Sequence, residues 1–485
     1  MADKKLYAAT VVVLDIVAAA IVFSSFAADT SEADFKSAMA QGADLESRQL
    51  YGRAVNAYRA ADKIHDSADL RLKVAELYGK GYENGEFATL EYRKNALRSV
   101  IRDYLDNERV LEAYDGLADI FNKEEDYEKL ANLVKHARAN GKNSDTLTSA
   151  YEDVKHRYTL SSLNVDMLES VGPYWIGRKA EEINEENGEN PINQFTFYYE
   201  NGENSDTYYS IEMSAPTDIK IDEENSFKYY FKKNYGNDSD TLEKNDEIYS
   251  AIYRDGVRRT YIDGDREGWY QFGSGMISLF DKSTGKWDVF NYEGEVKGSG
   301  YDTAGTFGNG FMYAEKDGKS RIIDTSFNDI FGEDMLAVTG FGGRCSINNR
   351  MFLKKKGENK YTMYDSSGSQ PVAMSFSCDN ADLFIENLAA FSNDGKWGFV
   401  DSTGNVVIEP KYDEAKSFHN GYAAVKENGV WGFINKNGEM IIEPQFEDAY
   451  YFRQKGKGFI KNEGAYSELT LFYTEEVSGD GVDQK

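Results

Sequence analysis

Apolar residues and alanines recur at every third or fourth position from Ser31 to about Tyr158. This spacing places them along one face of successive helices. Short glycine-containing stretches at residues 79–81, 84–85 and 140–141 are typical of helix ends. We therefore predict a domain of helical hairpin repeats over residues 30–160, closed by a last helix over residues 144–157.

The pattern changes near residue 160. Beyond it, short runs rich in Tyr, Phe, Val and Ile alternate with polar residues and are separated by Asn-Gly and Asp-Gly pairs. Alternation with a period of two predicts strands, and such pairs predict tight hairpin turns. The sequence thus predicts an α+β multidomain protein. Its second part is an all-β repeat array over residues 170–475, followed by a disordered acidic tail over residues 476–485.

Two clear copies of one motif lie inside the β part. They read GKWGFVDSTGNVVIEPKYDEAKSF and GVWGFINKNGEMIIEPQFEDAYYF. They align Trp397 with Trp431 and Gly398 with Gly432, so the period is 34 residues. Five weaker copies place the following residues at the position of the motif tryptophan: Arg258, Trp287, Ser320, Tyr361 and Tyr466. The pattern therefore predicts seven units.

Each part of the motif has a physical role. The Asn-Gly or Asp-Gly pair supplies the positive φ angles of a two-residue hairpin turn. The tryptophan packs its large face against the next unit, and the glycine beside it lets a neighbouring backbone approach closely. Three or four short strands do not cover their own apolar face, so the units must stack. On this interpretation Trp287, Tyr361, Trp397, Trp431 and Tyr466 are structural positions, and exposure for sugar stacking is the alternative.

The two full motifs resemble the WG β-repeat family, which is common in bacterial proteins. The resemblance is strongest over residues 390–452, and it implies a repeat array used for interaction, without transferable catalytic residues. Seven units imply either a closed, propeller-like ring or an open β-solenoid. We favour the ring because closure removes exposed sheet edges.

The helical part carries a second, partial resemblance. Tyr51, Ala54, Tyr58 and Ala61 form one stripe, and AYDGLADIFNKEEDYEKLANLVKHA repeats the alternation of small and aromatic residues. This spacing resembles the tetratricopeptide repeat, a helix–turn–helix unit. About three repeats would cover residues 33–140, although residues 81–87 interrupt the usual turn. The resemblance implies a concave groove for a peptide or helix, and a plain helical stalk is the alternative.

The N-terminus begins with Lys4 and Lys5 and continues with an apolar run over residues 6–27. Its length suits a membrane-spanning helix, and Asp15 near its middle costs about 2.5–3.5 kcal/mol on insertion scales. We favour an uncleaved single-pass membrane anchor over residues 1–29, with the bulk of the chain extracytoplasmic. The alternative is a signal peptide cleaved after Ala27, which leaves a secreted protein.

Composition narrows the partners. With 83 acidic and 55 basic residues among 485, the formal net charge is −28. Such a surface repels nucleic acid and anionic lipid headgroups, so neither is expected as a partner, and the membrane is contacted only through the N-terminal segment. The two cysteines, Cys345 and Cys378, are too few for a disulfide framework and are interpreted as buried apolar residues. Pairing across adjacent repeats is the alternative.

Catalytic motifs are absent from the sequence. The four histidines lie outside nucleophile motifs, and there is no P-loop, G-x-S-x-G or H-E-x-x-H. Asp263, Asp265 and Glu267 imitate the first half of a calcium loop, but Ser274 stands where the bidentate Glu belongs. We therefore predict a non-enzymatic scaffold that binds a protein or peptide, without cofactor or metal. The alternative is a cell-envelope protein that binds or hydrolyses carbohydrate in a cavity of the β-repeats.

Overall fold

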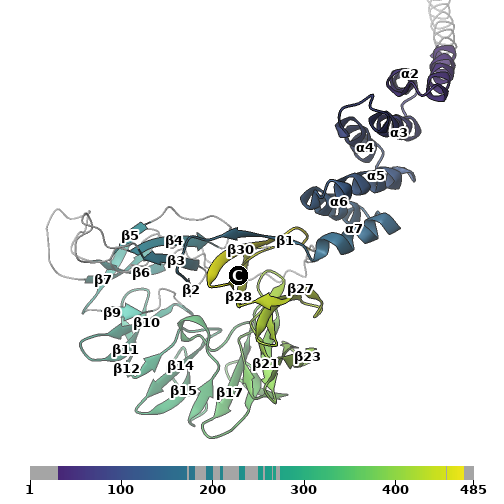
Figure 1. Ribbon diagram of the computed structural model, residues 1–485. Helices are drawn as coiled ribbons and strands as arrows, with labels where there is room; N and C mark the ends of the chain where they lie inside the picture. The colour runs from purple at the N-terminus through teal and green to yellow at the C-terminus, as the bar shows by residue number, and fades with distance from the viewer. Residues whose placement is uncertain are drawn as a thin grey trace, which may run out of the picture. The chain divides into compact units, whose positions relative to one another are not determined.

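The computed structural model describes residues 31–171, 174–180, 193–199, 208–210, 229–234, 249–254, 257–264, 266–268, 273–454 and 456–474. The chain divides into two compact units, residues 1–157 and 158–485 (Figure 1). The change from helix to strand predicted near residue 160 therefore falls at Arg157–Tyr158. Residues 158–160, expected in the helical domain, begin the first strand of the second unit, and strands also occupy part of residues 161–169.

The first unit consists of consecutive helices. A helix over residues 31–47 precedes the following six: α2 (Tyr51–Ile64), α3 (Ala68–Glu83), α4 (Glu91–Asp103), α5 (Val110–Lys123), α6 (Tyr127–Ala139) and α7 (Asp145–Lys155). Each helix from α2 onward contacts the next, α3 also contacts α5, and α5 also contacts α7. Small side chains permit this packing, since Ala54, Ala61, Ala113 and Ala137 are fully buried. The predicted helices are present, and the resemblance to tetratricopeptide repeats stays a prediction.

Side-chain caps fix several helix starts. Ser67, Asp126 and Ser144 each accept a hydrogen bond from the backbone amide three residues later, as N-cap residues do. Helix α2 has no such cap. Instead, the Glu86 carboxylate accepts bonds from the amides of Tyr51 and Gly52, at 3.1 and 2.7 Å. The segment that interrupts the predicted repeat turn thus caps a neighbouring helix.

The second unit contains eight antiparallel sheets within the described ranges. The first sheet comprises β2 (Met167–Val171), β3 (Tyr174–Ala180), β4 (Asn193–Tyr199) and β5 (Tyr208–Ser210), and the second comprises β6 (Tyr229–Asn234), β7 (Tyr249–Arg254) and β8 (Val257–Ile262). The third sheet comprises β9 (Arg266–Gly268), β10 (Met276–Asp281), β11 (Lys286–Asn291) and β12 (Val296–Tyr301). The fourth comprises β13 (Thr303–Ala304), β14 (Phe311–Lys316) and β15 (Lys319–Asp324).

A short 3-10 helix, η1 (Phe341–Gly343), lies within the stretch of chain that forms the fifth sheet. The fifth sheet comprises β16 (Met335–Ala337), β17 (Arg350–Lys355), β18 (Tyr361–Asp365) and β19 (Val372–Cys378), and the sixth comprises β20 (Asn380–Ala381), β21 (Leu388–Asn393), β22 (Lys396–Asp401) and β23 (Val406–Tyr412). The seventh sheet comprises β24 (Glu414–Ala415), β25 (Tyr422–Glu427), β26 (Val430–Asn435) and β27 (Met440–Phe446). The eighth comprises β28 (Asp448–Gln454), β29 (Lys457–Asn462) and β30 (Ala465–Leu471), and β1 (Tyr158–Ser162) joins it.

Apolar clusters join consecutive sheets from the second to the eighth. One cluster, for example, joins Ile408 and Phe399 of the sixth sheet to Val425 and Ile434 of the seventh. Figure 1 shows these sheets following one another through the unit. The structure therefore has the stacked units that the motif predicted, with one sheet more than the seven units counted from the sequence.

The first and eighth sheets also pack together, although they lie at opposite ends of the unit's sequence. Trp175 of β3 and Tyr198 of β4 share a cluster with Phe459 of β29 and Tyr466 of β30. In addition, β1 pairs with β30 over five residues, from Tyr158 opposite Leu471 to Ser162 opposite Ser467. The start of the β unit is thus held to its end by backbone hydrogen bonds and by aromatic packing.

The proposed membrane segment, residues 6–27, lies outside the described residues. Among the helices that the structure does describe, none is both long and apolar enough to cross a membrane.

Candidate interaction sites

All seven residues predicted at the tryptophan position occupy equivalent places. Each is the first or second residue of the third strand of its sheet: Arg258 in β8, Trp287 in β11, Ser320 in β15, Tyr361 in β18, Trp397 in β22, Trp431 in β26 and Tyr466 in β30. Trp397 lies opposite Tyr412, and Trp431 lies opposite Phe446, in the same register 34 residues apart. The sequence period therefore corresponds to one sheet.

The motif aromatics pack between sheets. Trp431 is 4% exposed and belongs to a cluster that reaches Phe452 and Ile460 of the eighth sheet. Trp397, Trp287 and Tyr361 are partly buried against the corresponding clusters of their own sheets. Trp431 is therefore buried between two sheets, whereas Trp287, Tyr361 and Trp397 keep part of their surface exposed, and their wedge role stays a prediction.

Gly398 and Gly432 are required by a close approach of the neighbouring strand. A Cβ added to Gly398 would lie 2.3 Å from the carbonyl oxygen of Ile408, and one added to Gly432 would lie 2.4 Å from that of Ile442. Both glycines face an irregularity in the pairing with the fourth strand, where the register shifts. Only a residue without a side chain fits here, because the contacted atoms belong to the backbone.

Residues with catalytic or metal-binding potential are dispersed. His65 contacts Glu32 at 3.1 Å, His136 contacts the Tyr114 hydroxyl at 2.6 Å, and His156 lies at the end of α7. Within the described residues no group of three or more His, Cys, Asp or Glu side chains is placed to hold a metal ion. Asp265 of the calcium-like segment lies outside the described residues.

His419 and the cysteines have perturbed environments. His419 stacks on Tyr451 with ring centroids 4.1 Å apart, and burial lowers the pKa of its imidazole against the opposing effect of Glu386 and Asp382. Cys345 and Cys378 are both free and buried, and burial raises the pKa of each thiol to about 12. They belong to different clusters, so the buried-apolar interpretation is confirmed and the cross-repeat pairing is wrong.

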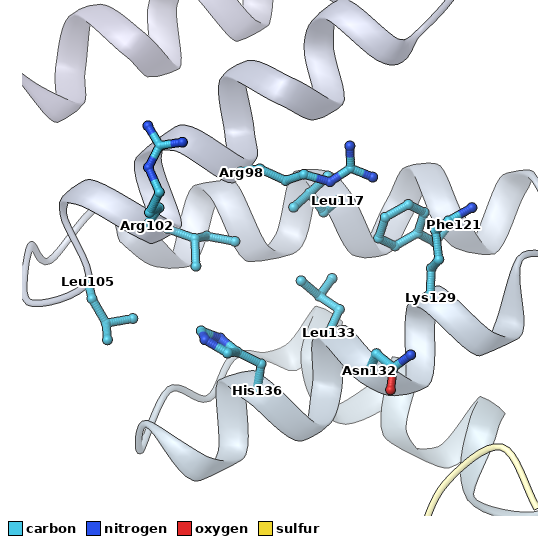
Figure 2. A pocket seen from close by; sticks show the side chains of 10 residues that line it. Arg98, Arg102, Leu105, Leu117, Phe121, Lys129, Asn132, Leu133 and His136 are labelled. Atoms are coloured by element: carbon cyan, nitrogen blue, oxygen red, sulfur yellow. The ribbon is translucent and has the colours of Figure 1, made fainter.

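A groove of about 550 Å³ crosses the helical unit, bounded by α4, α5 and α6. Its floor consists of Ile101, Leu117 and Phe121, and Leu105 and Leu133 extend the apolar surface to the sides. Figure 2 shows Leu133 pointing across the groove toward Leu117. Sequence reasoning expected a groove in this unit and placed Phe121 at a contact between helices, but it assigned no residue to the groove, since α4 and α6 are separated in sequence by α5.

The edges of this α4–α6 groove are basic. Arg98, Arg102 and Lys129 line it together with Asn132 and His136, and no carboxylate lines it (Figure 2). The three cations are 43%, 73% and 56% exposed. Each has an acidic neighbour outside the groove: Glu91 at 3.7 Å, Asp103 at 2.7 Å and Asp126 at 2.5 Å, respectively. The side chains that line this groove are therefore cationic or neutral over an apolar floor, and the carboxylates that pair with the cations do not line it.

The fold and these positions define a repeat protein with a helical unit and an array of β-sheets, in which a Trp-Gly motif recurs at the same position of the sheet. Residues 397–431 and 431–466 match the family described as WG containing repeat. The predicted WG repeats are therefore confirmed over residues 397–466. A search of curated protein sequences finds no match.

Solved structures with similar sheets share little sequence with this chain. Hsv2 of Kluyveromyces marxianus is 9% identical, with 42% of this chain and 72% of that chain covered and a TM-score of 0.29. Hsv2 of Kluyveromyces lactis is 9% identical, with 44% and 83% covered and a TM-score of 0.28. The β-propeller domain of the Trilobed protease from Pyrococcus furiosus is 11% identical, with 59% and 96% covered and a TM-score of 0.28. At these scores the similarity supports no argument about what this chain binds.

Proposed function

We propose that this protein is a non-enzymatic scaffold whose helical unit binds an acidic, amphipathic protein segment in the α4–α6 groove. The observation that carries the proposal is the combination of an apolar floor with three cations and no carboxylate along the same groove. A helix docks in such a groove by placing apolar side chains at intervals of three and four residues onto the floor. Its acidic side chains then meet the basic edges.

Charge selects the partner. Because the remainder of the chain is strongly acidic, most of its surface repels an acidic partner at long range, and the groove attracts it locally. Such electrostatic complementarity contributes to specificity and association rate more than to affinity. Affinity then depends mainly on the area buried against Leu117, Phe121 and Leu133.

The β unit provides the second surface, which we propose to be a closed, propeller-like ring. The contacts between the first and eighth sheets support closure, because an open solenoid would leave these two sheets apart. Closure would also protect the edge that β30 presents, since β1 occupies it. A rigid ring presents the loops of every sheet at fixed spacing, which suits a scaffold.

For location, we propose an extracytoplasmic protein held by a single N-terminal anchor. The support is the apolar run over residues 6–27 behind two lysines. Protease protection of the bulk of the chain in intact cells would contradict this location and leave the binding proposal untouched.

The binding proposal is tested with a designed helical peptide. A fluorescent peptide carries leucines at helical spacing and glutamates elsewhere, and a matched peptide carries lysines in place of the glutamates. Fluorescence anisotropy with the full chain should show saturable binding of the glutamate peptide, weakened by added salt because exposed charges are screened. The lysine peptide should not bind in this groove.

Paired charge reversals locate the binding. The double variant Arg98→Glu, Arg102→Glu should weaken binding of the glutamate peptide by about tenfold, since two exposed attractions become repulsions. The double variant Lys36→Glu, Arg48→Glu changes the net charge equally at exposed sites away from the groove. Equal weakening by both variants would reduce the effect to net charge and refute the groove as the site.

A further inference from the structure

A second cavity of about 330 Å³ lies among α3, α4 and α5. Its apolar lining comes from Leu72 and Ala75 of α3, Leu97 of α4 and Gly116 of α5. Its volume is at the lower end of the range for small-molecule sites. The α3–α5 cavity, as this space is called below, shares no lining residue with the α4–α6 groove.

Nearly every charge around the α3–α5 cavity already has a partner. Arg109 binds Glu112 through its Nε at 2.6 Å and Asp69 through a second nitrogen at 2.7 Å. Lys73 binds Glu76 at 3.0 Å, and also Glu46 at 2.8 Å. The three carboxylates that line the cavity, those of Asp69, Glu76 and Glu112, are therefore paired with these two cations.

Arg93 is the exception. Within the described part of the chain its guanidinium has neither a hydrogen-bond nor an ion-pair partner, and its Nε is shut off from solvent. An N–H group in that position costs about 1–3 kcal/mol if nothing accepts its hydrogen bond. Because solvent does not reach Nε, a ligand does not reach it either, and the two terminal nitrogens of Arg93 are the donors left for a ligand in the cavity that Arg93 lines.

Arg93 lies against Gly79. A Cβ added to Gly79 would lie 3.2 Å from Cδ and 3.3 Å from Nε of Arg93. The arginine side chain therefore lies flat on the backbone of α3, in the space that a larger residue would take. Glycine inside a helix costs about 1 kcal/mol relative to alanine, so this placement of Arg93 is maintained against helix propensity.

We propose that the α3–α5 cavity binds a small monocarboxylate with a short apolar tail. The carboxylate accepts hydrogen bonds from the two terminal nitrogens of Arg93, whose planar arrangement matches its two oxygens. The apolar tail covers Leu72, Ala75 and Leu97. The three carboxylates that line the cavity are paired with Arg109 and Lys73, so Arg93 supplies one unpaired positive charge, which suits a monoanion better than a dianion such as inorganic phosphate.

This proposal is independent of the acidic partner in the α4–α6 groove. The two sites use different residues and ligands of different size, so one can fail without the other. Arg93→Gln should leave binding of the glutamate peptide unchanged, and the charge reversals at Arg98 and Arg102 should leave monocarboxylate binding unchanged.

The experiment is a saturation-transfer NMR titration of the full chain with isovalerate, isovaleramide and inorganic phosphate. For about seven non-hydrogen atoms, a dissociation constant on the order of 1 mM is expected for isovalerate. The amide and phosphate should each bind at least about tenfold more weakly, because charge-assisted hydrogen bonds are lost or repulsion is added. Equal saturation by isovalerate and its amide, or no saturation by isovalerate, would overturn the proposal.

Two variants then assign the site. Arg93→Gln keeps most of the side-chain length but removes the charge, and it should weaken isovalerate binding at least about tenfold. Gly79→Ala keeps the charge and shifts the Arg93 side chain only slightly, so it should weaken binding less than Arg93→Gln. Arg48→Gln removes an exposed arginine elsewhere and should leave it unchanged. Circular dichroism checks that each variant is folded, and unchanged binding in a folded Arg93→Gln variant would refute the site.

Discussion

Replacing Gly432 with alanine tests the physical reason for the glycine of the WG motif. The new Cβ would lie 2.4 Å from the carbonyl oxygen of Ile442, 2.7 Å from the nitrogen of Pro444 and 2.9 Å from the carbonyl carbon of Glu443. All three atoms belong to the backbone of β27, so no side-chain rotation relieves the contact. The strand must move as a whole.

The magnitude follows from that displacement. Forcing an extra carbon into a well-packed site costs typically 1–3 kcal/mol, and occasionally more. Here the pairing of Trp431 with Phe446 and of Phe433 with Ile442 flanks the substituted position, so backbone hydrogen bonds are strained as well. Alanine regains up to about 1 kcal/mol by restricting the unfolded chain. We expect a net loss of about 3 kcal/mol, which corresponds to a fall of roughly 4–5 °C in the thermal midpoint of a unit as long as residues 158–485.

The assay is differential scanning calorimetry of the full chain, with a matched control three residues away. Gly429 has φ of +86°, and nothing lies within 4 Å of an added Cβ. Gly429→Ala therefore incurs only the strain of a left-handed backbone, about 1 kcal/mol, and Gly429→Asn should cost less because asparagine tolerates that conformation. A Gly432→Ala protein that melts with the wild type, or above Gly429→Ala, would refute the close-approach explanation.

Three further predictions follow from single contacts. Glu86→Gln should lower the stability of the helical unit by about 1 kcal/mol in denaturant titration, because the start of α2 loses a charged acceptor, whereas Glu83→Gln should have little effect. Cys345 and Cys378 should react with a thiol reagent at pH 8 only after unfolding, since burial raises the pKa of each to about 12; rapid labelling of the native chain would contradict this. Burial lowers the pKa of His419, so the unfolded chain takes up the proton first, and stability should fall as the pH drops below about 6.5. A urea midpoint that varies equally between pH 7.5 and 5.5 in wild type and His419→Asn would exclude this histidine as the cause.

Local chemistry made the turns and the repeat period predictable. The Asn428-Gly429 pair adopts φ of 53° and 86°, and Asp394-Gly395 adopts 51° and 76°, as a two-residue turn with positive φ angles requires. Ser320 and Arg258, in two weak copies, are each the second residue of the third strand of their sheet, as Trp397 and Trp431 are. These features depend on a few neighbouring residues, which is why one sequence suffices.

Long-range pairing was not predictable in the same way. Tyr158 lies opposite Leu471, more than 300 residues away, so no local pattern assigns β1 to the β unit. The first sheet, β2–β5, was not counted as a unit because its residues lack the Trp-Gly signature. Trp175 nevertheless packs against Tyr450 and Phe459 of the eighth sheet, with ring centroids 5.1 and 5.7 Å apart.

The candidate sites were missed for a related reason. Arg98 and Arg102 have the spacing of ordinary exposed helix residues, and only the packing of α4 against α5 and α6 makes them edges of one groove. Arg93 also looks like an ordinary helix residue in the sequence, and it differs only in that its Nε has no hydrogen-bond acceptor within the described residues. Such absences depend on tertiary structure, so no composition or spacing reveals them.

The Trp and Gly residues of the motif are poor candidates for recognising a partner, because they are already used in packing within the β unit. Gly398 and Gly432 are fixed by backbone approach, and the tryptophan beside each packs between sheets. Recognition of a partner must then depend on positions that have the same backbone geometry in each sheet but carry different side chains. Asp382 and Lys416 are such a pair: 34 residues apart, their amides bind the equivalent carbonyls of Ala390 and Ala424, yet their charges are opposite. Scanning such unequal positions, rather than the tryptophans, is therefore the direct route to what the β unit binds.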